Sequence, residues 1–591
     1  MSAGFRKSAG LRKSAGLRKS VMQRSLVGAS LLLSLAACDA GGNGGPPVVE
    51  PGSTIIGNQP GAGGSSNPDT TIPGSGGSGE PTDPGGGTGW TSQCASPELG
   101  GPGLRRLSRR ELEQTLRDIF PSLGAAWTSA LSADSLGSSG FDNDNELLVV
   151  SKQAAREIAT TAETVGENLA AAQASLLPCA AGSEATCAGQ FLDVQGRRLF
   201  RRPLTATERG TFLTFWNTAF TATGSFAQSV GWLSRALIES PEFVYRREIG
   251  TADGGSQRLD QFEIASELAY TFSGTAPSDE LLDRAGRGEL SSPQVLVQTA
   301  RELLETSGRS VVQSFFDAYV GHARITTIAK AGVPGFAERR EEMLEETRHF
   351  IEEVVFNRGG GVRELLTADF TTPSQKLAGF YEFTGASLPA SDYQVVPRPA
   401  GHGIGLLAQG SVLATLAQPN GSSPTKRGLW IFKHLLCNSV PPVPPNIPEL
   451  KPPAVGQITT RQRYAEQHAT GDCQGCHSRW DPIGFGFEHF NEAGQYREKE
   501  GGLDIDTSSH VPQAGRTLFE FDGQEDLMTQ LAELPLVHEC LSGYLATYAF
   551  GEQLTCGAES QRGAFISGEI GVLDYLASLA GEPHFTQRAI E

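Results

Sequence analysis

Two cysteines and a histidine near the carboxyl-terminal end of the chain stand in a pattern with defined chemistry. Cys473, Cys476 and His477 form C-x-x-C-H within GDCQGCHSRWDPIGFGFEHF, which runs from residue 471 to residue 490. Two thiols on one turn can form thioether bonds to a haem, and the imidazole that follows can bind its iron. The same residues would also serve as a redox dithiol or as half of a zinc site.

The surroundings of the motif favour haem over the other two sites. Structural zinc commonly takes four protein ligands, and the chain has no second C-x-x-C. A thioredoxin-like dithiol would lie between a strand and a helix. Here an amphipathic helix is expected before the cysteines, and a proline- and glycine-containing loop is expected after them. We therefore predict one covalent haem c, with His477 as the proximal ligand of the iron, Trp480, Phe485 and Phe487 as apolar walls, and the backbone carbonyl of Pro482 near the other ring nitrogen of His477.

The sequence does not decide which residue is the sixth ligand of the iron. Haem c iron commonly takes a second axial Met or His. The candidates are Met528, His468, His489 and His402. An open, five-coordinate iron is the alternative.

The amino-terminal residues resemble the signal of an exported bacterial lipoprotein. Residues 1–37 combine basic repeats with an apolar run, LVGASLLLSLAA, that is shorter than the roughly 20 residues of a membrane-spanning helix. The run ends in Leu35-Ala36-Ala37-Cys38, which is similar to a lipobox, so Cys38 is predicted to carry lipid. Ordinary cleavage at an Ala-x-Ala site is the alternative.

Residues 38–93 are rich in Gly, Pro, Ser and Thr and contain few large apolar side chains. Such a segment buries too little apolar surface to offset its ordering entropy, so it is expected to be an unstructured, flexible tether. Loss of segment 1–37 removes seven basic residues and no acidic one, and the formal net charge falls from −18 to −25. This acidic balance argues against nucleic acid as a partner.

Six of the nine cysteines remain once Cys38 and the C-x-x-C-H pair are set aside. An even number in an exported chain predicts three disulfides. Cys179–Cys187 and Cys540–Cys556 are expected because each pair brackets a short segment. Cys94–Cys437 is then left by elimination.

The body of the chain is predicted to be mainly α, because helical periodicity recurs and long alternating runs are scarce. Three segments begin with a capping box, in which a short polar residue is followed three positions later by Glu. They are Ser108 with Glu111, Thr205 with Glu208, and Asp260 with Glu263. Another helix is expected from Pro424 to Leu436, with Ser423 as its N-cap.

The segment from Cys473 to Arg497 resembles the haem segment of a family of large exported c-type cytochromes from planctomycetes and myxobacteria. The matching positions are Asp481, Pro482, Gly484, Phe485, Glu488, Phe490, Gly494 and Arg497. Asn491 stands where the family pattern has Asp, and the upstream histidine, His468, is one residue closer to the cysteines than usual. Further similar segments, including LRRLSRRELEQTLRDIF, RRLFRRPLTATE and CLSGYLATYAFGEQLTC, follow one another in the family order.

This resemblance implies several small helical domains. The expected boundaries are 94–180, 181–250 and 251–390 for three helical domains, 391–515 for a cytochrome c-like haem domain, and 516–591 for a last helical domain. The family domains are mostly of unknown function.

The expected function is that of an exported, membrane-anchored lipoprotein of the periplasm or cell surface that transfers electrons to a redox partner protein. One alternative is a haem-dependent oxidoreductase that acts on peroxide or a polymer. Di-haem peroxidases need two haems, however, and the chain has one attachment motif. The other alternative is a surface binding protein with a structural haem. The family resemblance also implies an association with polysaccharide.

Overall fold

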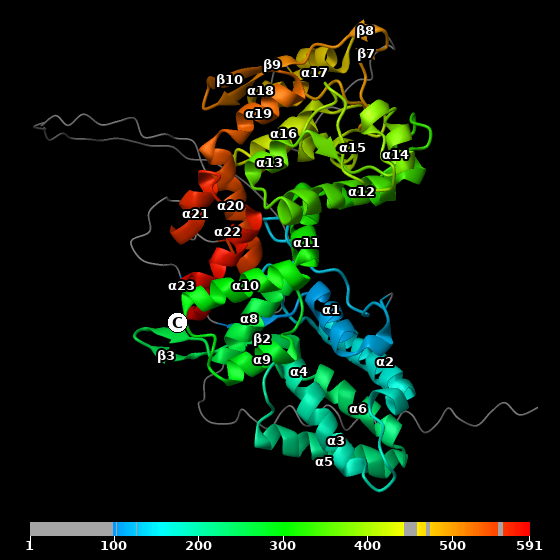
Figure 1. Cartoon of the computed structure of the whole chain (residues 1–591), viewed down its shortest axis with the longest axis vertical. Helices are drawn as coiled ribbons and strands as arrows, with labels where there is room; N and C mark the ends of the chain where they lie inside the picture. The colour runs from blue at the N-terminus through cyan, green and yellow to red at the C-terminus, as the bar shows by residue number, and fades with distance from the viewer. Residues whose placement is uncertain are drawn as a thin grey trace, which may run out of the picture. The chain divides into compact units, whose positions relative to one another are not determined.

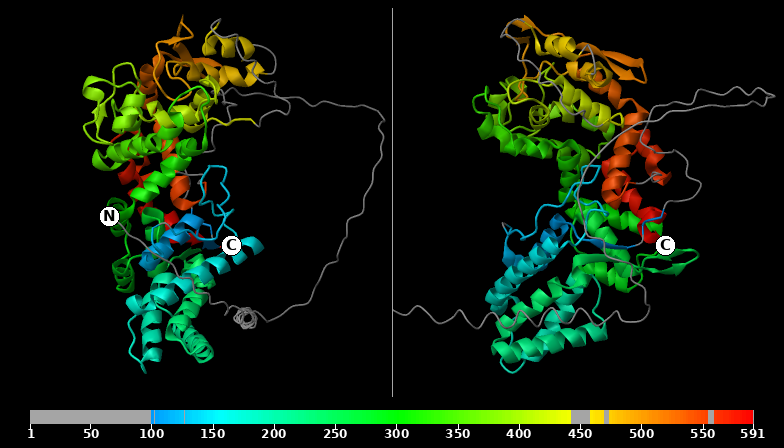
Figure 2. Two further views of the ribbon diagram at one scale, coloured as in Figure 1. Left: turned by 90° about the vertical axis from the view of Figure 1, so that its right-hand side faces the viewer. Right: turned by 180° about the vertical axis from the view of Figure 1, so that it is seen from behind.

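The computed structural model describes residues 99–101, 103–125, 127–441, 458–468, 473–553 and 559–590 (Figures 1 and 2). Helix accounts for 58% and strand for 9%, which confirms the mainly α prediction. Strands occur as short antiparallel pairs between helices, except for one three-stranded sheet. The signal segment 1–37, Cys38 and the tether 38–93 lie outside the described residues.

The first group of elements has a hydrophobic core of its own. It consists of β1 (Gly103–Arg106), α1 (Arg109–Ile119), α2 (Lys152–Leu176), α3 (Glu184–Phe191), α4 (Arg197–Phe200), α5 (Ala206–Thr223), α6 (Phe226–Ile238), α7 (Pro241–Val244) and β2 (Tyr245–Glu248). Helices α2 and α6 pack closely because Gly166 and Gly231 face each other. Strands β1 and β2 pair antiparallel, with Gly103 opposite Glu248.

The middle group begins with a hairpin and continues as helices. Its elements are β3 (Thr251–Asp253), β4 (Ser256–Arg258), α8 (Gln261–Ser273), α9 (Asp279–Gly286), α10 (Pro293–Ser307), α11 (Arg309–Val320), α12 (Phe336–Glu352), α13 (Val362–Thr367), β5 (Phe370–Thr371), α14 (Gln375–Phe380) and β6 (Val396–Pro397). Apolar side chains of α8, α10 and α11 belong to a large core that also takes side chains from the carboxyl-terminal helices.

The elements that follow carry the C-x-x-C-H motif. They are α15 (Gly410–Thr415), α16 (Pro424–His434), α17 (Thr460–His468), α18 (Gln474–Phe485), β7 (Lys499–Glu500), β8 (Leu503–Asp504), β9 (Ser508–Gln513) and β10 (Arg516–Asp522). Ser423 caps α16 as predicted, because its hydroxyl accepts a hydrogen bond from the Lys426 amide. The helix ends at His434, two residues before the predicted Leu436.

The carboxyl-terminal elements pack against elements from the middle of the sequence. They are α19 (Gly523–Ala532), α20 (Pro535–Phe550), α21 (Glu559–Ile566), α22 (Val572–Ser578), α23 (Pro583–Thr586) and β11 (Gln587–Ala589). Strand β11 pairs antiparallel with β4, and Arg588 also forms a bridge with Gly100. Three distant parts of the sequence therefore meet at β11.

All three predicted capping boxes are present. In α1, α5 and α8 the N-cap side chain accepts a hydrogen bond from the amide three residues on, and the Glu side chain accepts one from the N-cap amide. Glu208 additionally pairs with Arg202, at 2.7 Å between Oε1 and Nη2. This hydrogen bond is the main cause that lowers the pKa of Glu208 to about 2.

Replacing Glu208 by alanine is expected to lower the free energy of unfolding by about 1 kcal/mol at neutral pH, because the cap loses its partner. A lowered carboxyl pKa stabilises the fold above the ordinary value of 4.5, and this contribution is lost as the pH falls toward about 2. Urea unfolding should therefore show the difference from wild type shrinking in acid. Thr207→Ala, an exposed change in the same turn, is the control. Equal stability of Glu208→Ala and wild type at neutral pH would refute the role.

The disulfides agree with the sequence prediction at one pair and correct it at another. Cys179 is bonded to Cys187, as predicted. Cys437 is bonded to Cys540, so the predicted pairs Cys540–Cys556 and Cys94–Cys437 are wrong.

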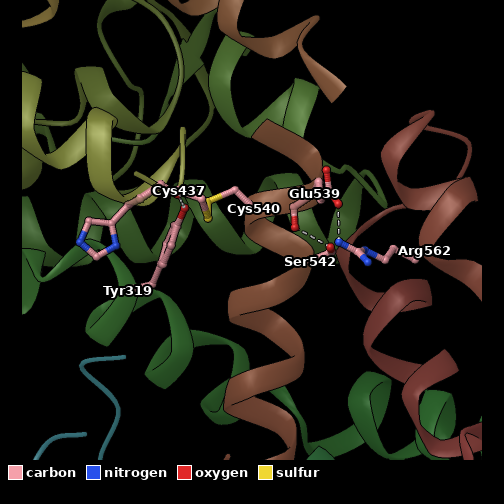
Figure 3. The surroundings of a disulfide bond; sticks show 7 residues. Tyr319, Cys437, Glu539, Cys540, Ser542 and Arg562 are labelled. Atoms are coloured by element: carbon pink, nitrogen blue, oxygen red, sulfur yellow. Dashed lines mark hydrogen bonds and ion pairs between the residues drawn. A yellow bond between two sulfur atoms is a disulfide. The ribbon is translucent and has the colours of Figure 1, made fainter. Parts of the chain in front are cut away.

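The physical reason for the correction is that α20 packs against the end of α16. Tyr319 donates a hydrogen bond to the His434 carbonyl beside the disulfide, and Glu539 on the far side of α20 pairs with Arg562 (Figure 3). Closeness in sequence misled the prediction, because the cysteine that Cys540 bonds lies 103 positions earlier. Cys94 and Cys556 lie outside the described residues.

Peptide mapping without reduction should join Cys179 to Cys187 and Cys437 to Cys540. Replacing both Cys437 and Cys540 by serine should cost about 2–5 kcal/mol of stability, since a long loop is no longer closed. A peptide that joins Cys540 to Cys556 instead would contradict the structure.

Within the part of the chain that the structure describes, no helix combines the length and the apolar composition that crossing a membrane requires.

Candidate functional site

The C-x-x-C-H motif lies on the first turn of α18, and α16 positions that helix. The two helices cross closely at two glycines. An added Cβ at Gly428 would collide with the Trp480 carbonyl oxygen, and one at Gly484 would collide with the Pro424 carbonyl oxygen. Only glycine fits at such a close approach of two backbones. The crossing brings Thr425 of α16 next to His477 of α18.

The segment after the cysteines is helical, not the predicted loop. Helix α18 runs through Pro482 to Phe485, although proline lacks the amide that an interior helical position normally donates. The contact with α16 compensates for this local cost. Because the segment is helical, His477 and Asp481 are one turn apart and face the same side.

The two cysteines of the motif are free thiols, in contrast to Cys179, Cys187, Cys437 and Cys540. Cys473 is the N-cap residue of α18 and Cys476 follows on the same turn, and both are partly exposed. This arrangement gives a reagent access to both sulfur atoms from solvent.

A buried carboxylate organises the site. Asp481 is 4% exposed, and its Oδ1 and Oδ2 each lie 3.1 Å from Nδ1 of His477. The Thr425 hydroxyl donates a further hydrogen bond to Oδ1 at 2.7 Å. Burial alone would raise the pKa of Asp481, but the hydrogen bonds from two imidazoles and from Thr425 outweigh it, so the pKa lies below its ordinary value.

His468 is the second imidazole on this carboxylate. Its Nδ1 lies 2.5 Å from Oδ2 of Asp481, and its ring centroid lies 3.6 Å from that of His477. An ionised carboxylate only accepts hydrogen bonds, so both imidazoles carry a proton on Nδ1. In the neutral form, each therefore has a lone pair on Nε2 for a metal. Ligand atoms of His468, His477 and Asp481 all lie within 4.8 Å of one another.

Of the four sixth-ligand candidates, only His468 is brought to His477. Met528 is fully buried in the core on α19. His489 and His402 both stack on Tyr496, and His489 donates through Nδ1 to the Arg497 carbonyl. Among the described residues, no hydrogen bond, ion pair or ring contact joins Met528, His489 or His402 to His477. The rings of His468 and His477 contact each other directly, with 3.6 Å between their centroids.

The predicted partner of the free ring nitrogen is corrected. Nδ1 of His477 is held by the Asp481 side chain rather than by the Pro482 carbonyl. The i, i+4 spacing of His477 and Asp481 is compatible with a contact on one helical turn, but the proline and glycines that follow Asp481 led to the prediction of a loop. Thr425 could not be found, because its proximity depends on how α16 crosses α18.

The aromatic residues after the motif are part of the core. Trp480 packs at 5.8 Å between ring centroids from His477 and at 5.7 Å from Phe432. Phe485 and Phe487 are also buried. Trp480 is the aromatic side chain of this set that lies against the candidate site.

Residues downstream of the motif fasten the segment to α16. The buried guanidinium of Arg427 donates hydrogen bonds to the carbonyls of Phe487, Phe490 and Asn491. Glu488 accepts a hydrogen bond from Ser422 at 2.8 Å. Burial lowers the pKa of Arg427 to about 10. These contacts give the Glu488–Arg497 part of the family-like pattern a structural role.

Four family models match consecutive parts of the chain, and each is described as a protein of unknown function. They are PSD3 (DUF1587) at residues 105–171, PSD5 (DUF1595) at 187–248, PSD4 (DUF1592) at 259–383 and PSCyt3 (DUF1588) at 404–500. The PSCyt3 match contains the C-x-x-C-H motif and Asp481. No curated protein and no solved structure matches the chain. The four domains fit the large exported cytochrome family that the sequence resembles.

Proposed function

Because the four matched domains point to a cytochrome-related multidomain protein, we propose that the chain is an exported c-type cytochrome with one covalent haem. Cys473 and Cys476 would form the two thioether bonds, and Nε2 of His477 would bind the iron. The observation that carries the proposal is the pair of free thiols on one turn, followed by an imidazole that a buried carboxylate holds through Nδ1.

The bound haem would supply one-electron transfer at its iron. Asp481 would fix the ring orientation and tautomer of His477, since residues that hydrogen-bond a ligating histidine commonly do so. Thr425 would in turn hold Asp481. The proposed partner is a redox protein. We also propose an association with polysaccharide, and only the family resemblance supports it.

Visible spectra of the purified protein, oxidised and reduced, test the haem and its coordination together. A low-spin spectrum requires a sixth ligand, and substitution of Met528, His468, His489 and His402 in turn would identify it. A high-spin spectrum that changes on addition of peroxide would favour a haem-dependent oxidoreductase over an electron carrier. Absence of any haem spectrum would contradict both.

A divalent metal ion is the second candidate for the same residues. Its support is the closeness of the ligand atoms of His468, His477 and Asp481, a set of nitrogen and oxygen donors that suits zinc. A zinc ion would replace the protons that the two Nδ1 atoms donate to the carboxylate. Metal analysis of protein from an exporting host separates the two candidates. One zinc ion per chain without haem, lost in Asp481→Ala, would favour the metal site. One iron per chain, matched by one covalently bound haem per chain, would favour the cytochrome.

Membrane anchorage is proposed from Leu35-Ala36-Ala37-Cys38. Cys38→Ser is expected to shift the protein from the membrane fraction to the soluble fraction, because the thiol that would accept the lipid is gone. Mass spectrometry of the mature amino terminus provides the direct check. A wild-type protein without lipid on Cys38, with fractionation unchanged in Cys38→Ser, would overturn the proposal.

A further inference from the structure

Two lysine side chains meet at the turn between α15 and α16. Nζ of Lys330 donates a hydrogen bond to the Gln418 carbonyl at 2.8 Å, and Nζ of Lys426 donates one to the Ala417 carbonyl at 3.1 Å. Lys426 lies in the first turn of α16, whereas Lys330 lies between the short helix His322–Thr327 and α12. Packing of α15 on that short helix and on α12 brings the two segments together (Figure 1). Since the two carbonyls belong to consecutive residues, the two ammonium groups are neighbours.

Lys330 carries its charge in a nearly closed position. It is 7% exposed, and lysine is seldom buried to this extent unless an anionic group pairs with it. It forms no ion pair with a carboxylate in the part of the chain that the structure describes, and the Gln418 carbonyl takes one of its three ammonium hydrogens. A buried charge without a counter-ion is costly, so an anion supplied from solution would stabilise this arrangement.

The charges around the two lysines are mainly positive. Burial, and then the charges of Lys426 and Arg427, lower the pKa of Lys330 to about 8. Burial, and then the charge of Arg324, lower the pKa of Lys426. Glu492 acts on Lys330 in the opposite direction, but no ion pair joins the two among the described residues.

Three of these cations have no ion-pair partner. Arg427 is offset by Glu488, whose Oε1 lies 3.9 Å from its Nη1. Arg324, Lys330 and Lys426 instead hydrogen-bond backbone carbonyls, and no described carboxylate pairs with them. The formal net charge of the whole chain is −18, so a cluster of this sign does not follow from the composition.

The cluster is open to solvent on one side. Lys426 and Arg324 are exposed, so an ion can approach the buried Lys330 beside them. Each ammonium group has two N–H donors left, and Arg324 uses Nε for the Gly321 carbonyl, which leaves its Nη donors. A tetrahedral oxyanion offers several acceptor oxygens, and both lysine and arginine are common ligands of phosphate.

We propose that Arg324, Lys330 and Lys426 bind a divalent tetrahedral oxyanion, phosphate or sulfate, either as the free ion or as a monoester. The anion would accept hydrogen bonds from the donors that the backbone carbonyls leave unused, and its charge would offset that of the two lysines. A monovalent carboxylate has half the charge and fewer acceptor oxygens, so it should bind more weakly. The site does not depend on haem.

Titration calorimetry on the full chain tests the site with four probes at matched ionic strength. They are inorganic phosphate, sulfate, glucose 6-phosphate and acetate. Saturable binding of phosphate or sulfate, tighter than that of acetate, is expected. Tighter binding of glucose 6-phosphate than of phosphate would assign the site to a monoester, and the reverse would assign it to the free ion. No saturable binding of phosphate, sulfate or the monoester, or binding no tighter than that of acetate, would overturn the proposal.

Lys426→Gln should weaken binding of the preferred anion about tenfold, because a charge-assisted contact is lost. Lys330→Gln should weaken it at least as much, but it changes a buried position, so the exposed Lys426 gives the cleaner test. Lys433→Gln is the matched control: it lies on the same helix, is exposed, and changes the net charge by the same amount. Its affinity should equal that of wild type. Unaltered affinity in Lys426→Gln, or equal weakening in Lys426→Gln and Lys433→Gln, would refute the assignment.

Discussion

Replacing Gly484 by alanine is expected to lower the free energy of unfolding by about 3 kcal/mol. The new Cβ would collide with the Pro424 carbonyl oxygen of α16, which is backbone and cannot turn away as a side chain would. Gly428→Ala should have a similar effect, since its Cβ would meet the Trp480 carbonyl oxygen. Both changes would force α16 away from α18 and so separate Thr425 from Asp481. Denaturant unfolding measures the loss.

Gly475→Ala is the matched control for that experiment. Gly475 lies on the same helix, between the two cysteines, and a Cβ there would meet nothing within 4 Å. Alanine is the better helix former at such a position, so this variant should be unchanged or more stable by up to about 1 kcal/mol. Equal stability of Gly484→Ala and Gly475→Ala would show that the close helix crossing does not hold the site.

The double variant Cys473→Ala and Cys476→Ala is expected to lose all covalent haem. No other free thiol is present among the described residues to form a thioether, because Cys179, Cys187, Cys437 and Cys540 are paired. The helical content should persist, since neither Cys473 nor Cys476 is among the buried residues of the large core, and Cys476 is only a partly buried neighbour of it. Haem staining of denatured protein, combined with circular dichroism, measures both expectations.

His477→Ala separates attachment from iron binding. It should keep haem on the cysteines but change its spectrum, because the proximal imidazole is gone. Ser478→Ala, an exposed change at the next position, is the control and should match wild type. A His477→Ala spectrum identical to that of wild type would assign the iron ligand to another residue.

Local signals predicted much of the helical fold. The three capping boxes depend on residues three positions apart, and all three begin helices in the structure. Ser423 and Pro424 likewise marked the start of α16. Such patterns succeed because the interactions that form them lie within one turn of the chain.

Contacts between distant segments were the part that the sequence did not reveal. The helix through Pro482 depends on α16, and the Cys437–Cys540 bond depends on where α20 packs. At the site, the spacing of Cys473, Cys476 and His477 was enough to predict them as a group. The role of Asp481, whose carboxylate contacts both His468 and His477, depends on a helical turn that Pro482 argued against in the sequence.

The mass of the denatured wild-type polypeptide tests the central claim most directly. The protein should be exported in a host that has the haem-attachment machinery, then denatured, reduced and separated from free cofactor. We expect the polypeptide to be heavier by one haem and to retain haem absorbance, with the added mass on the peptide that contains Cys473 and Cys476. A polypeptide with the unmodified mass and no haem absorbance would contradict the account.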